Sequence, residues 1–183
     1  MIPELGHFAL VLALLLAAAQ AATTLAGAQL GERRGALLIA AGPPTAIGGA
    51  AFVALSFGSL MWSYAVSDFS VANVVRNSHS LKPMLYKLTG TWGNHEGSMV
   101  LWILILGLCS AAVAWFGTNL PATLRARVLG VLGLVSVGFL LFTLLTSNPF
   151  ERVWPIPEDG TDLNPLLQDP GLAFHPPFLY LGY

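Results

Sequence analysis

Long apolar runs separated by polar linkers dominate the hydrophobic pattern of the chain. Four runs lie at about residues 8–30, 37–66, 99–117 and 128–146, and each approaches or exceeds the length of about 20 residues that a helix needs to cross a bilayer. A spanning segment must satisfy its own backbone hydrogen bonds, so we expect all four runs to be helices. The pattern predicts an all-α, polytopic transmembrane protein in which residues 1–183 belong to one membrane domain.

Two proline pairs modify this pattern. The run at 37–66 is longer than one span and contains Pro43-Pro44, so we expect a helix that starts or kinks at the prolines, with residues 37–42 near the membrane interface. The last apolar segment, 176–183, opens on a second proline pair. Proline is favoured at the first position of a helix, which predicts the start of a fifth helix with His175 at its mouth.

The composition agrees with a membrane environment. Only 9% of the residues are charged and 55% are hydrophobic, whereas a soluble domain carries about 25% charged residues. The net charge of −1, without a basic stripe, does not indicate a nucleic-acid partner. The single cysteine, Cys109, excludes an internal disulfide and is expected to be a packing residue. No lysine or arginine precedes the first run, so we expect an uncleaved helix there rather than a signal peptide.

Basic residues predict the orientation of the spans. The short linkers at 31–36 and 118–127 have the higher density of positive charge, carried by Arg33, Arg34, Arg125 and Arg127. Dense positive charge in short linkers marks the cytoplasmic side. We therefore expect the N-terminus, the long segments 67–98 and 147–175, and His175 on the outer side. Glycines at 48, 49, 130, 133 and 138 allow close helix contacts, although ordinary membrane composition would also explain them.

Few polar residues suggest chemistry. His95-Glu96 is not a zinc-protease motif, because position 99 is methionine instead of histidine. A structural role is the simpler interpretation: Glu96 would favour the N-terminus of the third spanning helix, with Gly93 or Asn94 near its cap. A Cys/His/carboxylate cluster for a dedicated metal site is absent from the sequence.

The remaining histidines differ in their surroundings. His7 begins the first helix and His79 lies in a polar loop, where solvation or hydrogen bonding explains each of them. His175, at a predicted helix start on the outer side, could be a haem or metal ligand, a proton carrier or an interfacial hydrogen-bonding residue. Asp162 and Asp169 lie in turn-rich sequence, where aspartate commonly makes local turns.

Four strings in this order and spacing carry a family resemblance. They are Thr91-Trp-Gly-Asn-His-Glu-Gly-Ser98, Thr146-Ser-Asn-Pro-Phe150, Leu163-Asn-Pro-Leu-Leu-Gln-Asp-Pro-Gly171 and Phe174-His-Pro-Pro177. Together they resemble the N-terminal portion of the CcmF/NrfE family, the membrane haem lyase subunits of cytochrome c maturation. The resemblance extends from the first helix to the last residue.

The resemblance implies a function and a site. Family members at the outer face of the bacterial inner membrane receive haem from a haem chaperone and promote its thioether attachment to the Cys-x-x-Cys-His motif of an apocytochrome c. His175 matches the first of two external histidines that ligate this haem, so the resemblance implies haem as a substrate held through His175. Trp92, His95 and Glu96 are then outer-face structural or site-lining residues.

Three departures limit what the resemblance implies. The family's tryptophan-rich haem-binding signature, its second external histidine and the paired histidines of its permanent b-type haem have no counterpart in this sequence. We therefore expect the chain alone to lack complete haem lyase activity and to be a fragment or one piece of a divided protein. Expected partners are the remainder of the lyase, the haem chaperone, apocytochrome c and the subunits that handle its thiols, besides membrane lipid. The alternative is a structural or transporter subunit without haem chemistry; a transporter would usually carry ionisable residues inside its spans.

Overall fold

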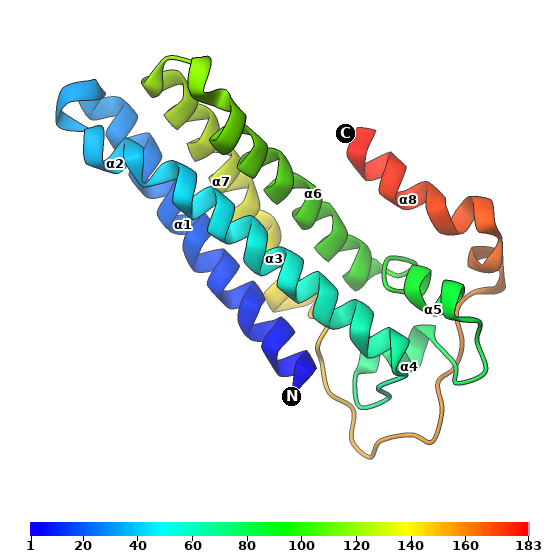
Figure 1. The fold of residues 1–183 in the computed structure, drawn as a ribbon. Coiled ribbons are helices and arrows are strands. Elements are labelled where there is room, and N and C mark those ends of the chain that lie inside the picture. The colour runs from blue at the N-terminus through cyan, green and yellow to red at the C-terminus, as the bar shows by residue number, and fades with distance from the viewer. Residues whose placement is uncertain (183) are drawn as a thin grey trace. The chain divides into compact units, whose positions relative to one another are not determined.

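The computed structural model describes residues 1–182, including the side chains of all of these except Leu166 and Leu167, and the described residues form helices and loops without β-strands. The last residue of the predicted segment 176–183 thus lies outside the described residues. Figure 1 shows the helices, which in chain order are α1 (Ile2–Arg34), α2 (Ala36–Ala40), α3 (Gly42–Ala65), α4 (Ala72–Asn77), α5 (Met84–Gly90), α6 (His95–Phe116), η1 (Gly117–Asn119), α7 (Ala122–Thr146), η2 (Pro165–Gln168) and α8 (Pro170–Gly182).

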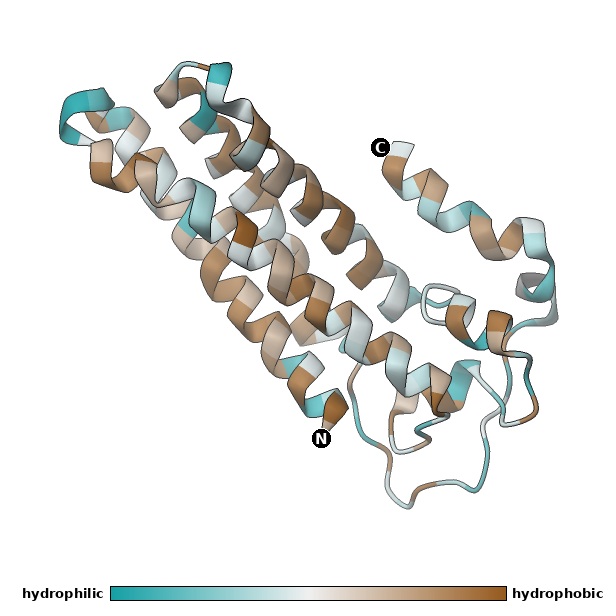
Figure 2. Ribbon diagram, viewed as in Figure 1, coloured by the Kyte–Doolittle hydropathy of each residue, from teal (hydrophilic) through white to brown (hydrophobic). Residues whose placement is uncertain are grey.

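Four helical segments are long and apolar enough to cross a membrane, which confirms the predicted all-α fold with four spans. They comprise Ile2–Arg34, Ala36–Ala65, His95–Asn119 and Ala122–Thr146. Figure 2 shows the long helices coloured mainly as hydrophobic, with hydrophilic residues gathered at turns and loops. Three of the spanning segments are longer than the apolar runs that predicted them, because polar residues in the terminal turns also take helical conformation, whereas the second, of 30 residues, is as long as its run.

The proline pair in the second segment marks a helix start, as predicted. The short helix α2 ends at Ala40, and α3 begins at Gly42, so that Pro43 and Pro44 occupy its first turn. Their missing N–H groups would have no intrahelical partner there. Further upstream, Gly31 interrupts α1 with a φ of 78°, a conformation that glycine adopts readily, and so turns the chain ahead of α2.

The chain divides into two compact units, each described by itself. The first, called here the bundle unit, consists of Ala9–Ala54 and Ile103–Phe142. Parts of α1, α3, α6 and α7 run side by side in it (Figure 1). Small residues bring the helices together: a Cβ added at Gly133 would lie 3.0 Å from the Ala21 nitrogen and 3.1 Å from the Ala17 oxygen. Gly138, by contrast, has nothing within 4 Å of such a Cβ. The predicted close packing therefore holds at Gly133 and not at Gly138.

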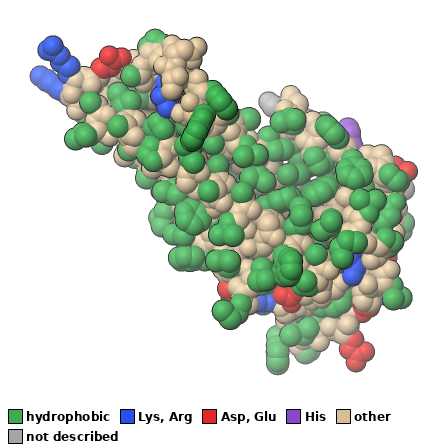
Figure 3. Space-filling view, in the orientation of Figure 1, with side chains coloured by type: hydrophobic (Ala, Val, Ile, Leu, Met, Phe, Trp, Pro, Cys, Tyr) green, Lys and Arg blue, Asp and Glu red, His purple; other side chains and the backbone are tan. Residues whose placement is uncertain are grey.

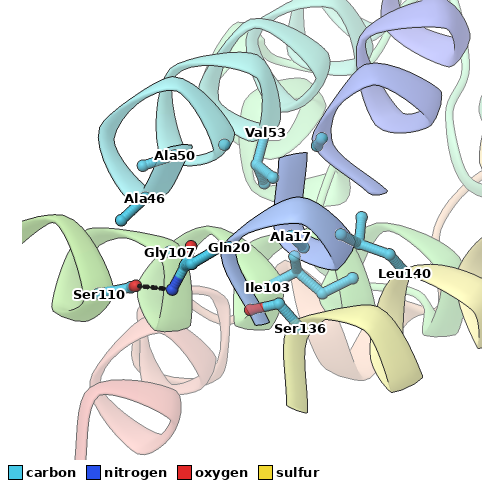
Figure 4. A pocket seen from close by; sticks show the side chains of 12 residues that line it. Ala17, Gln20, Ala46, Ala50, Val53, Ile103, Gly107, Ser110, Ser136 and Leu140 are labelled. Carbon is cyan, nitrogen blue, oxygen red and sulfur yellow. Dashed lines mark hydrogen bonds between the residues drawn. The ribbon is translucent and has the colours of Figure 1, made fainter. Parts of the chain in front are cut away.

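A buried glutamine adds a polar contact inside the bundle unit. Gln20 is 4% exposed, and its Nε2 donates to the Ser110 hydroxyl at 3.0 Å and to the Leu129 carbonyl at 2.7 Å. Figure 4 shows this amide beside a cavity of about 20 Å³ lined mostly by small and apolar residues. A cavity of that volume holds about one water molecule. The bundle unit therefore has no room here for a substrate.

The second unit, called here the loop unit, consists of Met1–Phe8, Leu55–Trp102 and Thr143–Tyr183. It contains both long segments that the sequence assigns to the outer side, together with α4, α5 and α8. An isolated antiparallel bridge joins Val71 to Arg152, and the Ala72 amide donates to the Glu151 carbonyl at 2.8 Å. These backbone contacts tie the two long segments to each other.

Large apolar side chains cover much of the surface. Figure 3 shows hydrophobic groups spread over the visible face. Of the large apolar residues of the chain, Trp115 is 68% and Leu145 78% exposed. Extensive apolar patches of this kind mark surfaces that face lipid or another protein rather than water. Cys109 is exposed on α6 as well, so the prediction that it packs in the interior is wrong.

Candidate functional site

The helix that carries His175 begins earlier than the sequence predicted. Helix α8 starts at Pro170, because the Asp169 carboxylate accepts a hydrogen bond from the Leu172 amide at 3.2 Å and thereby caps the first turn. Pro170, not Pro176, is the proline of the first turn. His175 therefore lies inside α8, and the prediction that it precedes the first turn of a helix is wrong.

Two prolines inside α8 leave the helix short of donors. In an α-helix the amide of residue 177 would donate to the carbonyl of residue 173, and Pro177 has no N–H. The Ala173 carbonyl instead accepts a hydrogen bond of 2.8 Å from the indole Nε1–H of Trp92. Ala173 is only 4% exposed, so water has little access to it. Trp92 thus replaces the donor that the helix lacks.

A second tryptophan contacts the same face of α8. Trp102 stacks on Tyr180 with ring centroids 6.0 Å apart and an interplanar angle of 17°. Ala173 and Tyr180 are two turns apart and share a face, whereas His175 lies roughly 200° around the helix from Ala173 at about 100° per residue. The His175 side chain is accordingly exposed, on the side of α8 away from both tryptophan contacts.

The face of α8 that bears His175 is apolar, and one of its positions, Gly171, has no side chain. Gly171 and Leu172 precede the histidine by one turn, and Phe178 and Leu179 follow it by one turn. Phe178 is 73% and Leu179 41% exposed. An imidazole nitrogen flanked by exposed apolar groups and a glycine is a suitable ligand for the metal of a flat, largely apolar group.

Trp92 stacks on a helix residue, and its neighbours in the segment 91–98 are closely packed. Its ring stacks on Phe57 with centroids 6.3 Å apart and an interplanar angle of 19°. Next to it, Thr91 is fully buried, and a Cβ at Gly93 would lie 3.3 Å from a methyl carbon of Leu163. The strings around residues 91–98 and 163–171 therefore meet in the loop unit.

Asn94 caps the third spanning helix, as the sequence suggested. Its Oδ1 accepts the Gly97 amide at 2.8 Å, and α6 begins at His95. The same cap belongs to a buried polar network: Asn73 Nδ2 donates to Asn94 Oδ1 at 2.8 Å and to Glu96 Oε2 at 3.3 Å. Tyr64, fully buried, donates to Asn73 Oδ1 at 2.6 Å. Glu96 is thus engaged at the start of α6.

Tyr64 and Asn73 were not predicted to belong to this network. Their only signal was the requirement that a buried tyrosine hydroxyl and a buried amide find partners. Neither position reveals its partner locally, because Tyr64 lies in the apolar helix α3 and Asn73 in the short helix α4, some distance from Asn94 in the chain.

The other histidines occupy different surroundings. His95 Nε2 lies 3.1 Å from the Ser147 hydroxyl, a contact that joins the start of α6 to the end of α7. His79 Nε2 lies 3.5 Å from Asp159 Oδ2, and its Nδ1 accepts the Leu81 amide at 3.2 Å.

His7 lies in α1 beside a surface cavity of about 320 Å³. The other residues that line this cavity are Pro3, Glu4, Asn148, Phe150, Glu151 and Arg152. His175 is in none of these groups, and the described residues contain no cluster of three histidine, cysteine or acidic side chains suited to a metal ion.

Charged residues of the segment 147–175 bind other residues of the loop unit. Arg152 binds the Glu4 carboxylate and the Ser70 hydroxyl. In the second pair Ser80 donates from its amide (2.8 Å) and from its hydroxyl to Asp159. These hydrogen bonds and the nearby His79 lower the pKa of Asp159 to about 2.

Three comparisons place the chain among known proteins. The family model described as cytochrome C assembly protein matches residues 92–183. The whole chain is 56% identical to the cytochrome c-type biogenesis protein ccl1 of Rhodobacter capsulatus and 54% identical to the cytochrome c-type biogenesis protein CcmF of Pseudomonas aeruginosa, and covers 28% of each. A solved structure titled cytochrome c heme lyase CcmF matches with a TM-score of 0.84 and 25% identity over the whole chain, which covers 28% of it. The chain thus spans about 28% of the length of these relatives.

Proposed function

Because the chain belongs to the cytochrome c assembly protein family, we propose that it forms the part of a membrane haem lyase that supplies one axial ligand to the haem being attached. It is a multi-pass membrane protein with four spanning helices. The observation that carries the proposal is the exposed imidazole of His175 on α8, a helix that Trp92 and Trp102 hold through the opposite face.

His175 has the properties that axial ligation needs. A neutral imidazole nitrogen is a common ligand of haem iron, and His175 is exposed. Phe178 and Leu179 beside it are apolar, which suits the porphyrin faces and edges. In the proposed reaction His175 holds the iron and thereby fixes the position of the haem vinyl groups relative to the incoming apocytochrome.

The covalent step adds thiols to vinyl groups. In each addition the S–H of an apocytochrome cysteine adds across a vinyl C=C: the sulfur bonds to one carbon and the hydrogen ends on the other. Two such additions give two thioethers without a leaving group or net electron transfer. Cys109 does not supply a thiol in this scheme, because it lies within the spanning helix α6.

The proposed location is the bacterial inner membrane, with the loop unit on the periplasmic side. Arginines at the linkers after α1 and α6 support this orientation: Arg33, Arg34 and Arg127 are exposed there. Haem then arrives from a periplasmic haem chaperone, and apocytochrome c from the subunits that handle its thiols. The second histidine ligand, the tryptophan-rich surface and the b-type haem are assigned to parts of the lyase other than residues 1–183.

The test is the yield of cytochrome c in cells. The complete protein encoded by the gene, with His175→Ala, is expressed in a strain without its own haem lyase, and covalently haem-stained cytochrome c is quantified. We expect a small fraction of the wild-type yield at an unchanged amount of lyase in the membrane. His79→Ala, which changes another histidine of the loop unit, should leave the yield near wild type. Normal yield with His175→Ala would overturn the proposal.

A further inference from the structure

We propose that Trp92 is a positioning residue for His175, acting through the backbone of α8. Its indole N–H would hold the helix in the one rotation that directs the imidazole away from the rest of the loop unit. This inference rests on the haem-ligating role of His175 proposed above. Trp92 itself touches neither the histidine side chain nor, in this scheme, the haem.

Pro177 leaves one backbone carbonyl of α8 without a hydrogen-bond donor in its own helix. Proline donates no hydrogen bond, so the Ala173 carbonyl has no intrahelical donor at position 177. Because Ala173 is buried, a partner must come from the protein. The indole of Trp92 provides it at 2.8 Å, from a loop some eighty positions away in the chain.

Two contacts hold the same face of α8. A hydrogen bond to a helical carbonyl constrains where the Ala173 side of α8 faces, and the stack of Trp102 on Tyr180 constrains the same face two turns later. With two points of one face fixed, rotation about the helix axis is restricted. His175, on the other side, then keeps a single direction, which ligation of a metal at a fixed place requires.

The indole of Trp92, which donates this hydrogen bond, is itself held in place. Trp92 stacks on Phe57, and its neighbour Thr91 is fully buried. The following residues lead directly into α6, whose first turn Asn94 caps. The indole is therefore anchored to the spanning helices α3 and α6, within their loop-unit portions. An anchored donor can hold a helix in place, whereas a mobile side chain could not.

The roles of ring and donor can be separated by substitution. Trp92→Phe keeps an aromatic ring against Phe57 and removes only the N–H. Pro177→Ala returns an amide that can donate to the Ala173 carbonyl within the helix. If the N–H is what matters, Pro177→Ala should compensate for Trp92→Phe; if the size of the indole is what matters, it should not.

The experiment uses the complete protein, purified with bound haem, in four forms: wild type, Trp92→Phe, Pro177→Ala and the double variant. Trp115→Phe, at an exposed position of α6, is the matched control. The absorption spectrum, after subtraction of the contribution of the b-type haem, gives the fraction of substrate haem with two axial ligands, and hydrogen exchange of residues 170–182 reports the order of α8 independently of haem. Because Trp92→Phe removes one hydrogen bond, we expect it to change both the fraction of haem with two axial ligands and the exchange rate in α8 by about 2- to 10-fold. Both quantities should recover in the double variant. Added imidazole should restore the spectrum alone.

Two results would overturn the inference. One is a Trp92→Phe protein with the wild-type spectrum and wild-type exchange in α8. The other is a defect that Pro177→Ala leaves unchanged, which would assign Trp92 to packing alone. Failure of the ligation proposal has a different signature: His175→Ala would leave the spectrum unchanged, while the exchange data would still report whether Trp92 orders α8.

Discussion

Lys82 and Asp162 form an ion pair between the two long segments of the loop unit. The lysine Nζ lies 2.5 Å from Asp162 Oδ1, and the lysine side chain is only 2% exposed, against 45% for the aspartate. Nζ also donates to the Asn77 carbonyl at 3.3 Å. Backbone bonds continue the contact, since the Asp162 amide donates to the Ser78 carbonyl at 3.1 Å. The segment that leads to α8 is thus fastened to the segment that leads to Trp92.

Removing the aspartate should destabilise this contact more than removing the lysine. Asp162→Asn leaves a buried ammonium without its counter-charge, at a cost of about 1–3 kcal/mol. Lys82→Met removes the buried charge and keeps the apolar stem, so its effect should be smaller. The order of stability of the two variants and wild type is measured by thermal unfolding of the complete protein in detergent. Equal stability of all three proteins would contradict the assignment.

Low pH should destabilise the contact between the two long segments of the loop unit. The pKa of Asp159 is lowered to about 2, first by the Ser80 hydroxyl and then by backbone amides and His79. Partial burial alone would raise the pKa of Asp162, but hydrogen bonds from Lys82 and Leu163 outweigh it and the net shift is downward. A lowered pKa means that the stabilisation is complete above the unfolded value near 4 and is lost as pH falls through the folded value.

Pepsin cleavage between pH 5 and pH 2 can follow this loss when it is divided, at each pH, by the cleavage of an unfolded reference peptide, because the activity of pepsin itself rises towards pH 2. Cleavage within residues 157–164 should rise as the pH approaches 2 in wild type. Asp159→Asn should already be cut readily at pH 5, because its stabilisation is absent throughout. A wild-type protein that shows no rise, or a variant that shows the same profile as wild type, would refute the pH dependence.

A bulky residue at Gly133 should disrupt the helix bundle. Its Cβ would press on backbone atoms of Ala17 and Ala21, which cannot move aside as a flexible side chain can. Gly133→Val is expected to cost about 1–3 kcal/mol, read as a lower unfolding temperature in detergent. Gly138→Val places the same side chain on the same helix where nothing lies within 4 Å, so it should melt close to wild type. Equal melting temperatures of the two variants would contradict the packing described here.

Labelling of single cysteines tests on which side of the membrane the loop unit lies. With Cys109→Ala as background, Glu158→Cys places a thiol at an exposed position of the loop unit and Thr118→Cys one at the linker after α6. A membrane-impermeant maleimide should label the first in intact cells with a permeable outer membrane, and the second only after lysis. The reverse pattern would place the loop unit and His175 in the cytoplasm.

The spanning helices could be predicted from the sequence because lipid requires long apolar helices. Their ends could not be predicted from hydropathy. Helix α7 begins at Ala122, well before the apolar run at 128–146, since residues around Arg125 and Arg127 can be helical outside the hydrocarbon. The start of α8 was predicted wrongly at Pro176, because Pro170 suits a first turn equally well. The Asp169 cap decides for Pro170, and the strength of one cap is not visible in a hydrophobic pattern.

The candidate site was predictable in part. His175 and the Asn94 cap could be selected from local sequence, and Asn94 does cap α6. The bond from Trp92 to Ala173 could not, because it joins residues far apart in the chain. A signal existed nevertheless: adjacent prolines inside an apolar helix remove two donors, and the buried carbonyl left by Pro177 requires one from elsewhere. The ligand role of His175 remains a proposal that rests on its exposure and on the family.

The most direct test of that role is the absorption spectrum of the complete, haem-loaded protein, wild type against His175→Ala. We predict that, once the contribution of the b-type haem is subtracted, the variant loses the spectrum of haem with two axial ligands by about tenfold or more, equivalent to at least about 1.4 kcal/mol of ligation free energy, and that added imidazole restores it. A His175→Ala protein whose spectrum matches wild type, with or without imidazole, would show that His175 does not ligate the haem.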